Sequence, residues 1–177
     1  MKNFMKWTDM EPIPRTYEIL AWKVFNRSVD EKWADWAVEM MQAGFETESL
    51  SMLALLEKPY NQFELKELTD RILVELGLSY EDNETVIRNY ATYLVDLGLK
   101  GEKELRVLLS SLRDIYYASD YNSEYLDFYL LSYAKEDLEF DEFQYYWNDA
   151  DRTNIDEEIL KVFRKWKDES AIDDQKD

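Results

Sequence analysis

The scarcity of chain breakers is the feature that most constrains what this chain can fold into. Only 4 glycines and 3 prolines occur in 177 residues, and apolar residues recur at intervals of three and four along most of the chain. That spacing puts apolar side chains on one face of an α-helix, and no stretch of strict alternation rivals it. We therefore predict an all-α protein of about seven to nine helices, packed as antiparallel helical hairpins.

Capping residues and glycines predict where these helices begin and end. Ser28 and Glu31 match a capping box for the second helix, which should stop at Gly44. The other expected caps and stops are Thr47, Asn61, Gly98, Gly101 and either Thr153 or Asn154. We find no internal boundary and expect one domain over residues 1–177, with 1–14 and 169–177 extended or frayed.

Composition excludes several classes of function. The chain has no cysteine and no histidine, so thiolate nucleophiles, imidazole bases and the usual zinc sites are impossible. No nucleotide-binding glycine motif occurs. We expect no cofactor, no metal and no catalysis, and no targeting or membrane-spanning segment, so a cytoplasmic location is the default.

The net charge of −18 disfavours direct binding to nucleic acid or to anionic membranes, and favours a basic protein partner. The excess charge is concentrated. Residues 120–158 hold 13 acidic and two basic residues, together with ten of the aromatic residues. Aromatic side chains supply contact area at interfaces, and surrounding carboxylates steer a basic partner. Alternatively, the carboxylates only form a solvated outer face.

We predict a partner-binding surface between about Tyr121 and Asp151. Its residues are Tyr121, Glu124, Glu136, Asp137, Glu139, Asp141, Glu142, Tyr145, Tyr146, Trp147, Asp149 and Asp151. The run of aromatics from Phe140 to Trp147 cannot point into one helical core stripe, so either some are exposed or the segment is irregular and packs on both sides. Trp33 and Trp36 are expected in the core.

Three segments resemble small all-α bacterial immunity proteins, which neutralise a toxin made by the same cell. They are Trp33-x-x-Trp36-Ala37 running to Gly44, Ser49-Leu50-x-x-Leu53-Ala54, and Glu75-Leu76-Gly77-Leu78. The resemblance covers roughly residues 17–100. It implies inhibition by binding, without catalysis.

Our leading hypothesis is thus a non-catalytic cytoplasmic binding protein that occludes a basic partner, such as a nuclease-type toxin. A variant is a nucleic-acid mimic, whose carboxylates would be spaced like phosphates. The alternatives are a helical scaffold or adaptor that binds through an apolar groove, and a carboxylate-only enzyme dependent on Mg²⁺. The sequence leaves the partner's identity and the oligomeric state open.

Overall fold

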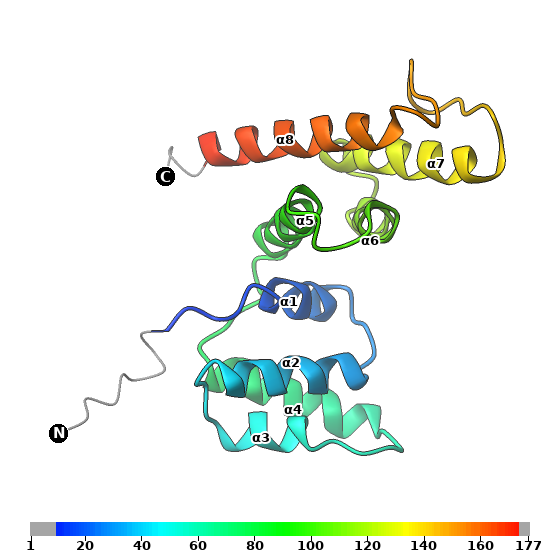
Figure 1. The fold of residues 1–177 in the computed structure, drawn as a ribbon. Coiled ribbons are helices and arrows are strands. Elements are labelled where there is room, and N and C mark those ends of the chain that lie inside the picture. Colours follow the sequence, from blue (N-terminus) through cyan, green and yellow to red (C-terminus); the bar gives the residue numbers. More distant parts are fainter. Residues whose placement is uncertain (1–9, 174–177) are drawn as a thin grey trace. The chain divides into compact units, whose positions relative to one another are not determined.

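The computed structural model describes residues 10–173, and helices account for all the regular structure in that range (Figure 1). It contains eight α-helices, one short 3-10 helix and no β-strand over those residues. The elements are α1 (Thr16–Val24), α2 (Glu31–Gln42), α3 (Glu48–Ala54), α4 (Gln62–Glu75), α5 (Asn83–Leu99), α6 (Leu105–Ala118), η2 (Ser123–Tyr125), α7 (Leu126–Phe140) and α8 (Ile155–Asp173). The predicted all-α class and number of helices are confirmed.

Helices that follow one another in sequence pack together in several places: α2 with α3, α3 with α4, α6 with α7, and α7 with α8. Their arrangement as antiparallel hairpins stays a prediction. Of the helices in residues 10–173, none combines the length and apolar character needed to cross a bilayer.

The chain divides into two compact units, one ending at Val86 and the other beginning at Ile87, inside the first turn of α5. The first unit holds α1 to α4, and the second holds most of α5 together with α6, α7 and α8. The prediction of a single domain over residues 1–177 stays a prediction.

The core of the first unit is built on tryptophans and aliphatic side chains. Trp33 and Trp36 are at most 1% exposed, which confirms them as core residues. The Trp36 indole donates to the hydroxyl oxygen of Thr16 at 3.0 Å, so this buried donor is satisfied. Buried side chains of α1, α2, α3 and α4 thus form one hydrophobic core.

Side-chain caps begin three helices of the first unit. Thr47 and Asn61 cap α3 and α4 as predicted, each accepting a backbone N–H bond from the first turn. The predicted cap of α2 is wrong. Asp30, not Ser28, occupies that position, and its carboxylate accepts from the N–H of Lys32 at 3.0 Å. Asp30 adjoins the first helical residue and is itself a favoured cap.

The core of the second unit joins aromatic rings of η2, α7 and α8. Phe128 lies 5.8 Å from Phe163 and 5.2 Å from Trp166 between ring centroids, and Tyr125 lies 5.6 Å from Trp166. All four side chains are at most 7% exposed. The second unit therefore buries Tyr125 and Phe128 of the aromatic-rich segment.

The predicted stop of α5 at Gly98 is wrong, because the helix continues through Gly98 to Leu99. The predicted stop at Gly101 is confirmed, since this residue is left-handed with φ +68°. The predicted end of the last helix is also wrong. Helix α8 continues to Asp173, so residues 169–173 are helical instead of frayed. Residues 10–13 precede α1 without helical structure, whereas 1–9 and 174–177 lie outside the described residues.

Candidate functional site

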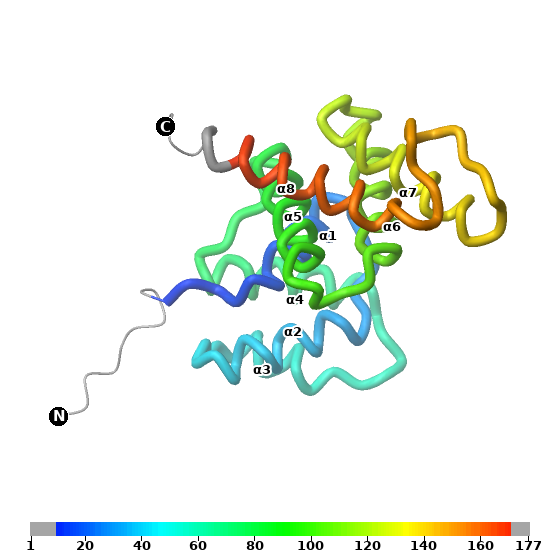
Figure 2. Tube along the Cα trace, turned by 45° about the horizontal axis from the view of Figure 1, so that its top comes forward, coloured from blue at the N-terminus to red at the C-terminus, as the bar shows by residue number. Residues whose placement is uncertain are grey.

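The predicted binding residues gather around the end of α7 and the α7–α8 loop, residues 141–154. Figure 2 shows this loop, in yellow to orange, extending beyond the end of α7. The Gln144 side chain organises it. Its amide NH₂ donates to the carbonyls of Trp147 and Ala150, and its carbonyl oxygen accepts from the N–H groups of Tyr146 and Trp147, each at 2.8 Å. One side chain therefore gives the loop a defined conformation.

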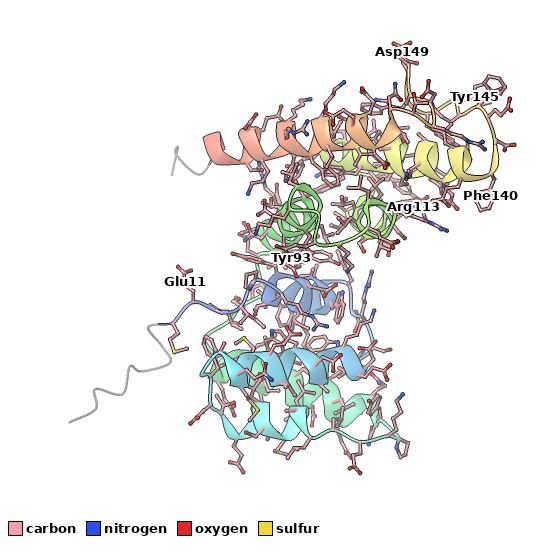
Figure 3. All side chains as sticks on the ribbon, in the orientation of Figure 1. Glu11, Tyr93, Arg113, Phe140, Tyr145 and Asp149 are labelled. Carbon is pink, nitrogen blue, oxygen red and sulfur yellow. The ribbon has the colours of Figure 1, made fainter. Side chains whose placement is uncertain are left out.

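Large aromatic side chains are exposed at this end of the unit. Tyr145 is 94% exposed, Phe140 76% and Phe143 72%. Figure 3 shows Tyr145 and Phe140 directed away from the helices, with Asp149 on the same loop. The expected exposure within the run from Phe140 to Trp147 is confirmed for these three rings. Phe140 and Phe143 were missing from the predicted binding residues, although their position off the core stripe was the signal.

Three carboxylates and two of these rings line one open pocket. Asp137, Asp141 and Glu142 meet Phe143 and Tyr145 around a solvent-open depression of about 410 Å³. The turn that ends α7 creates it, because Asp141 leaves the helix in an extended conformation while its N–H still bonds the carbonyl of Asp137 at 2.7 Å. We call these five residues the acidic–aromatic pocket. In the part of the chain that the structure describes, its three carboxylates form no ion pair.

Three other predicted acids are already paired with cations of the same unit. The pairs are Glu124 with Arg88 (3.6 Å), Glu136 with Arg113 (2.8 Å) and Glu139 with Arg106 (3.1 Å). Such surface pairs contribute only about 0–1 kcal/mol to stability. Their charges are nevertheless partly balanced, so the unpaired acids of the pocket are the better candidates for contact with a partner.

Asp149 and Asp151 serve the turn that leads into α8. Hydrogen bonds from the Thr153 hydroxyl (2.6 Å) and N–H (2.7 Å) hold the pKa of Asp151 below its usual range. Asn154 donates to the carbonyl of Asp149 and accepts from the N–H of Asp151, both at 2.8 Å. The side chains of Thr153 and Asn154 are thus engaged in this turn, where a cap for α8 was predicted.

Two of the remaining predicted aromatics, Tyr121 and Tyr146, belong to a row of tyrosine rings in contact with one another. Tyr146 stacks on Tyr133 at 5.3 Å, and Tyr121, which is 62% exposed, meets the edges of Tyr116 and Tyr117 at 5.5 and 5.9 Å. Tyr129 lies between these ends. Trp147 is half-buried, and its indole donates to Glu158 at 3.5 Å.

A hydrogen bond within this tyrosine row shifts the pKa of one of its tyrosines. The hydroxyls of Tyr117 and Tyr133 lie 3.0 Å apart. That hydrogen bond, with burial as a smaller cause, raises the pKa of Tyr117 to about 12. Tyr116 and Tyr117 were missed by sequence reasoning, although they stand one turn before Tyr121. The row links Tyr121 to Tyr146 across α6 and α7 and holds the loop against the helices.

This chain matches no family model, no curated protein and no solved structure. The residues behind the immunity-type resemblance are mainly core residues of the first unit, and Trp33, Trp36, Leu50 and Leu53 are all at most 1% exposed. They describe a packing pattern, not a site. Membership of that class stays a prediction.

The described residues contain no cluster suited to a metal ion. Among residues 10–173, no three acidic side chains converge closely enough to hold a metal ion. The carboxylate-only enzyme stays a prediction without residues to assign.

Proposed function

We propose that this chain is a non-catalytic binding protein of the inhibitor type, which covers a basic protein partner such as a toxin. The observation that carries the proposal is the acidic–aromatic pocket, which Asp137, Asp141 and Glu142 line together with the exposed rings of Phe143 and Tyr145. The surface would work by occlusion, with no bond made or broken.

The chemistry of the pocket suits an arginine or lysine side chain. A cation over an aromatic face gains about 0.5–1 kcal/mol at an exposed site and about 2 kcal/mol or more when water is excluded. Carboxylates at the rim add charge-assisted hydrogen bonds, which are strongest when a guanidinium is held by both of its N–H groups. A protein partner with a protruding arginine is therefore the best fit, and the surrounding negative charge would speed its approach.

Exposed rings make the apolar part of such an interface. A buried aromatic side chain removes about 150–250 Å² from water, and the strongest interface positions are worth about 2 kcal/mol or more. Because Tyr145 is 94% exposed in the free chain, nearly its whole surface is available for burial. Tyr145→Ala should weaken partner binding by about 30-fold, the equivalent of about 2 kcal/mol.

A charge-matched pair of variants tests the proposal. The pocket variant carries Asp137→Asn, Asp141→Asn and Glu142→Gln. The control carries Glu46→Gln, Glu57→Gln and Glu64→Gln, three exposed acids of the first unit. Each loses three of the negative charges that make up −18, so only the position of the change differs.

Both variants and the wild type are used as baits in the native host, and the Kd of the captured partner is measured against salt concentration. We expect the pocket variant to bind at least about tenfold more weakly, with a shallower salt dependence, while the control binds like the wild type. Equal affinity and equal salt slopes for the two variants would refute the proposal. Weak salt dependence throughout would favour the adaptor hypothesis instead.

A further inference from the structure

The tyrosine row exposes more aromatic surface than is needed to hold the loop. Its six rings come from α6, the turn after α6, α7 and the α7–α8 loop (Figure 1), and they are Tyr116, Tyr117, Tyr121, Tyr129, Tyr133 and Tyr146. Tyr121 is 62% exposed, Tyr117 43% and Tyr146 39%, and the other three are half-buried. The row is thus a partly open aromatic surface within the second unit, and contiguous exposed surface of this kind marks interaction sites.

Most hydroxyl groups of the row are available to a ligand. Those of Tyr117 and Tyr133 bond each other at 3.0 Å, whereas the other four have no hydrogen-bond partner among residues 10–173. The hydroxyls of Tyr116 and Tyr129 remain open to solvent although their rings are half-buried. Because a tyrosine hydroxyl both donates and accepts, a ligand on the row would find hydrogen-bond donors without breaking internal bonds.

The length of the row suits an extended peptide. From Tyr121 through Tyr116, Tyr129 and Tyr133 to Tyr146, successive ring centroids are 5.5, 4.7, 5.1 and 5.3 Å apart. A polyproline II segment advances about 3.1 Å per residue. The row therefore spans at most about six residues of such a segment.

The chemistry of the row favours proline within that segment. A polyproline II helix has no internal hydrogen bonds, and proline has no N–H, so such a segment presents carbonyl acceptors to the tyrosine hydroxyls. Its rings pack on aromatic side chains, and its preformed conformation loses little entropy on binding. The structure contains no β-strand over residues 10–173, so an extended peptide has no sheet edge to join there.

The row leads into the acidic–aromatic pocket. Tyr146 directly follows Tyr145, and Tyr133 lies one helical turn before Asp137 on α7. The Arg113 guanidinium already lies 4.9 Å from the Tyr133 ring centroid, so a second cation on the row would be repelled. A basic residue beside the proline segment is therefore directed to the carboxylates of the pocket.

We propose that the tyrosine row and the acidic–aromatic pocket together bind a proline-rich segment of the partner, with prolines across the rings and a flanking arginine or lysine in the pocket. This inference rests on the proposed function, which places a cation in the pocket, and it specifies the part of the partner that is recognised.

Synthetic peptides test the inference on the full chain. One peptide carries an arginine before six prolines and another carries it after them, both with blocked ends and a fluorescent label. Fluorescence anisotropy at constant ionic strength gives the Kd, and we expect at least one of the two to bind. Replacing its prolines by alanine, or its arginine by glutamine, should each weaken binding by about tenfold or more.

Variants of the chain locate the bound peptide. Tyr121→Ala should weaken binding by about tenfold because an exposed ring is lost, and Tyr121→Phe by about threefold because only a hydroxyl is lost. Phe63→Ala, which removes a 72% exposed ring of the first unit, should leave binding unchanged. The variant with Asp137→Asn, Asp141→Asn and Glu142→Gln should weaken binding of the arginine peptide and not of its glutamine counterpart.

The proposal is overturned if neither proline peptide binds, if the alanine or glutamine peptide binds equally well, or if Phe63→Ala acts like Tyr121→Ala. Binding of the sugar cellohexaose in place of the peptides would also overturn it, because the row would then recognise carbohydrate. None of these results alters the partner capture that tests the proposed function, so the two proposals can fail separately.

Discussion

Replacing Gly98 by alanine should destabilise this protein, although alanine is the better helix former. Gly98 lies inside α5, where glycine costs about 0.5–1 kcal/mol relative to alanine. A Cβ added there would lie 2.5 and 2.9 Å from two ring carbons of Phe163, and 3.1 Å from a methyl carbon of Leu108. Ordinary carbon contacts are about 3.5–4.0 Å, so the methyl group does not fit.

The Phe163 ring has little freedom to move aside. Its side chain is fully buried, and it packs edge-to-face on Phe128 with 5.8 Å between centroids. Forcing an extra carbon into such a core costs about 1–3 kcal/mol. After the gain in helix propensity is subtracted, Gly98→Ala should lower the free energy of unfolding by about 1–2 kcal/mol.

The assay is urea unfolding followed by helical circular dichroism. Asn89→Ala is the matched control, because Asn89 is exposed on the same helix and its replacement should stabilise by about 0.5 kcal/mol. A cycle with Phe163→Leu should show coupling of at least about 0.5 kcal/mol, since the smaller side chain makes room for the methyl group. If Gly98→Ala is as stable as the wild type, or if the cycle is additive, the packing argument fails.

Three further predictions follow from local contacts. Tyr133→Phe should return the pKa of Tyr117 from about 12 towards its ordinary value of 10.0, as read by ultraviolet titration. Because the folded pKa is raised, the wild-type free energy of unfolding should fall as the pH rises from about 10 to 12, and less so in the variant. Burial opposes ionisation of Glu75, but hydrogen bonds that include one from the Ser49 hydroxyl at 2.7 Å hold its pKa below 4.5. The resulting stabilisation is present above pH 4.5 and is lost as the pH falls through the folded pKa. Ser49→Ala should therefore raise the pKa of Glu75, which carboxyl NMR measures. It should also reduce the fall in unfolding free energy at acid pH, which acid unfolding measures. Gln144→Ala removes four hydrogen bonds of the α7–α8 loop and should greatly accelerate amide hydrogen exchange there, while α8 keeps its protection; unchanged exchange in the loop would contradict the assigned role of this side chain.

Local signals in the sequence predicted the helices well, because periodicity and capping depend on residues within a few positions of each other. Thr47 and Asn61 cap the helices that they were expected to cap. One error occurred where two local signals competed. Ser28 formed a good capping pattern with Glu31, but Asp30 stood closer to the helix and took the position.

Gly98 shows where local reasoning ends. A glycine near the end of a helical pattern indicates a helix stop, and Gly101 obeys that rule with its positive φ. Gly98 does not, because its absent side chain accommodates Phe163, which lies 65 positions later in the sequence. No local pattern encodes a contact of that range.

The candidate site divides in the same way. Composition alone located the acidic and aromatic segment, since charge and ring counts need no coordinates. It could not separate the acids paired with Arg88, Arg106 and Arg113 from those that remain unpaired, because the arginines come from helices α5 and α6.

By itself, the sequence determined the helical class, the number of helices and the region where negative charge and aromatic rings concentrate, because these are sums over neighbouring residues. Only the tertiary structure decided that Asp137, Asp141 and Glu142 share one pocket with Phe143 and Tyr145. It also decided that the Phe163 ring of α8 packs where Gly98 of α5 has no side chain. The pocket depends on the backbone path of the turn that ends α7, which helical periodicity does not encode, and the contact at Gly98 depends on packing between segments far apart in the chain.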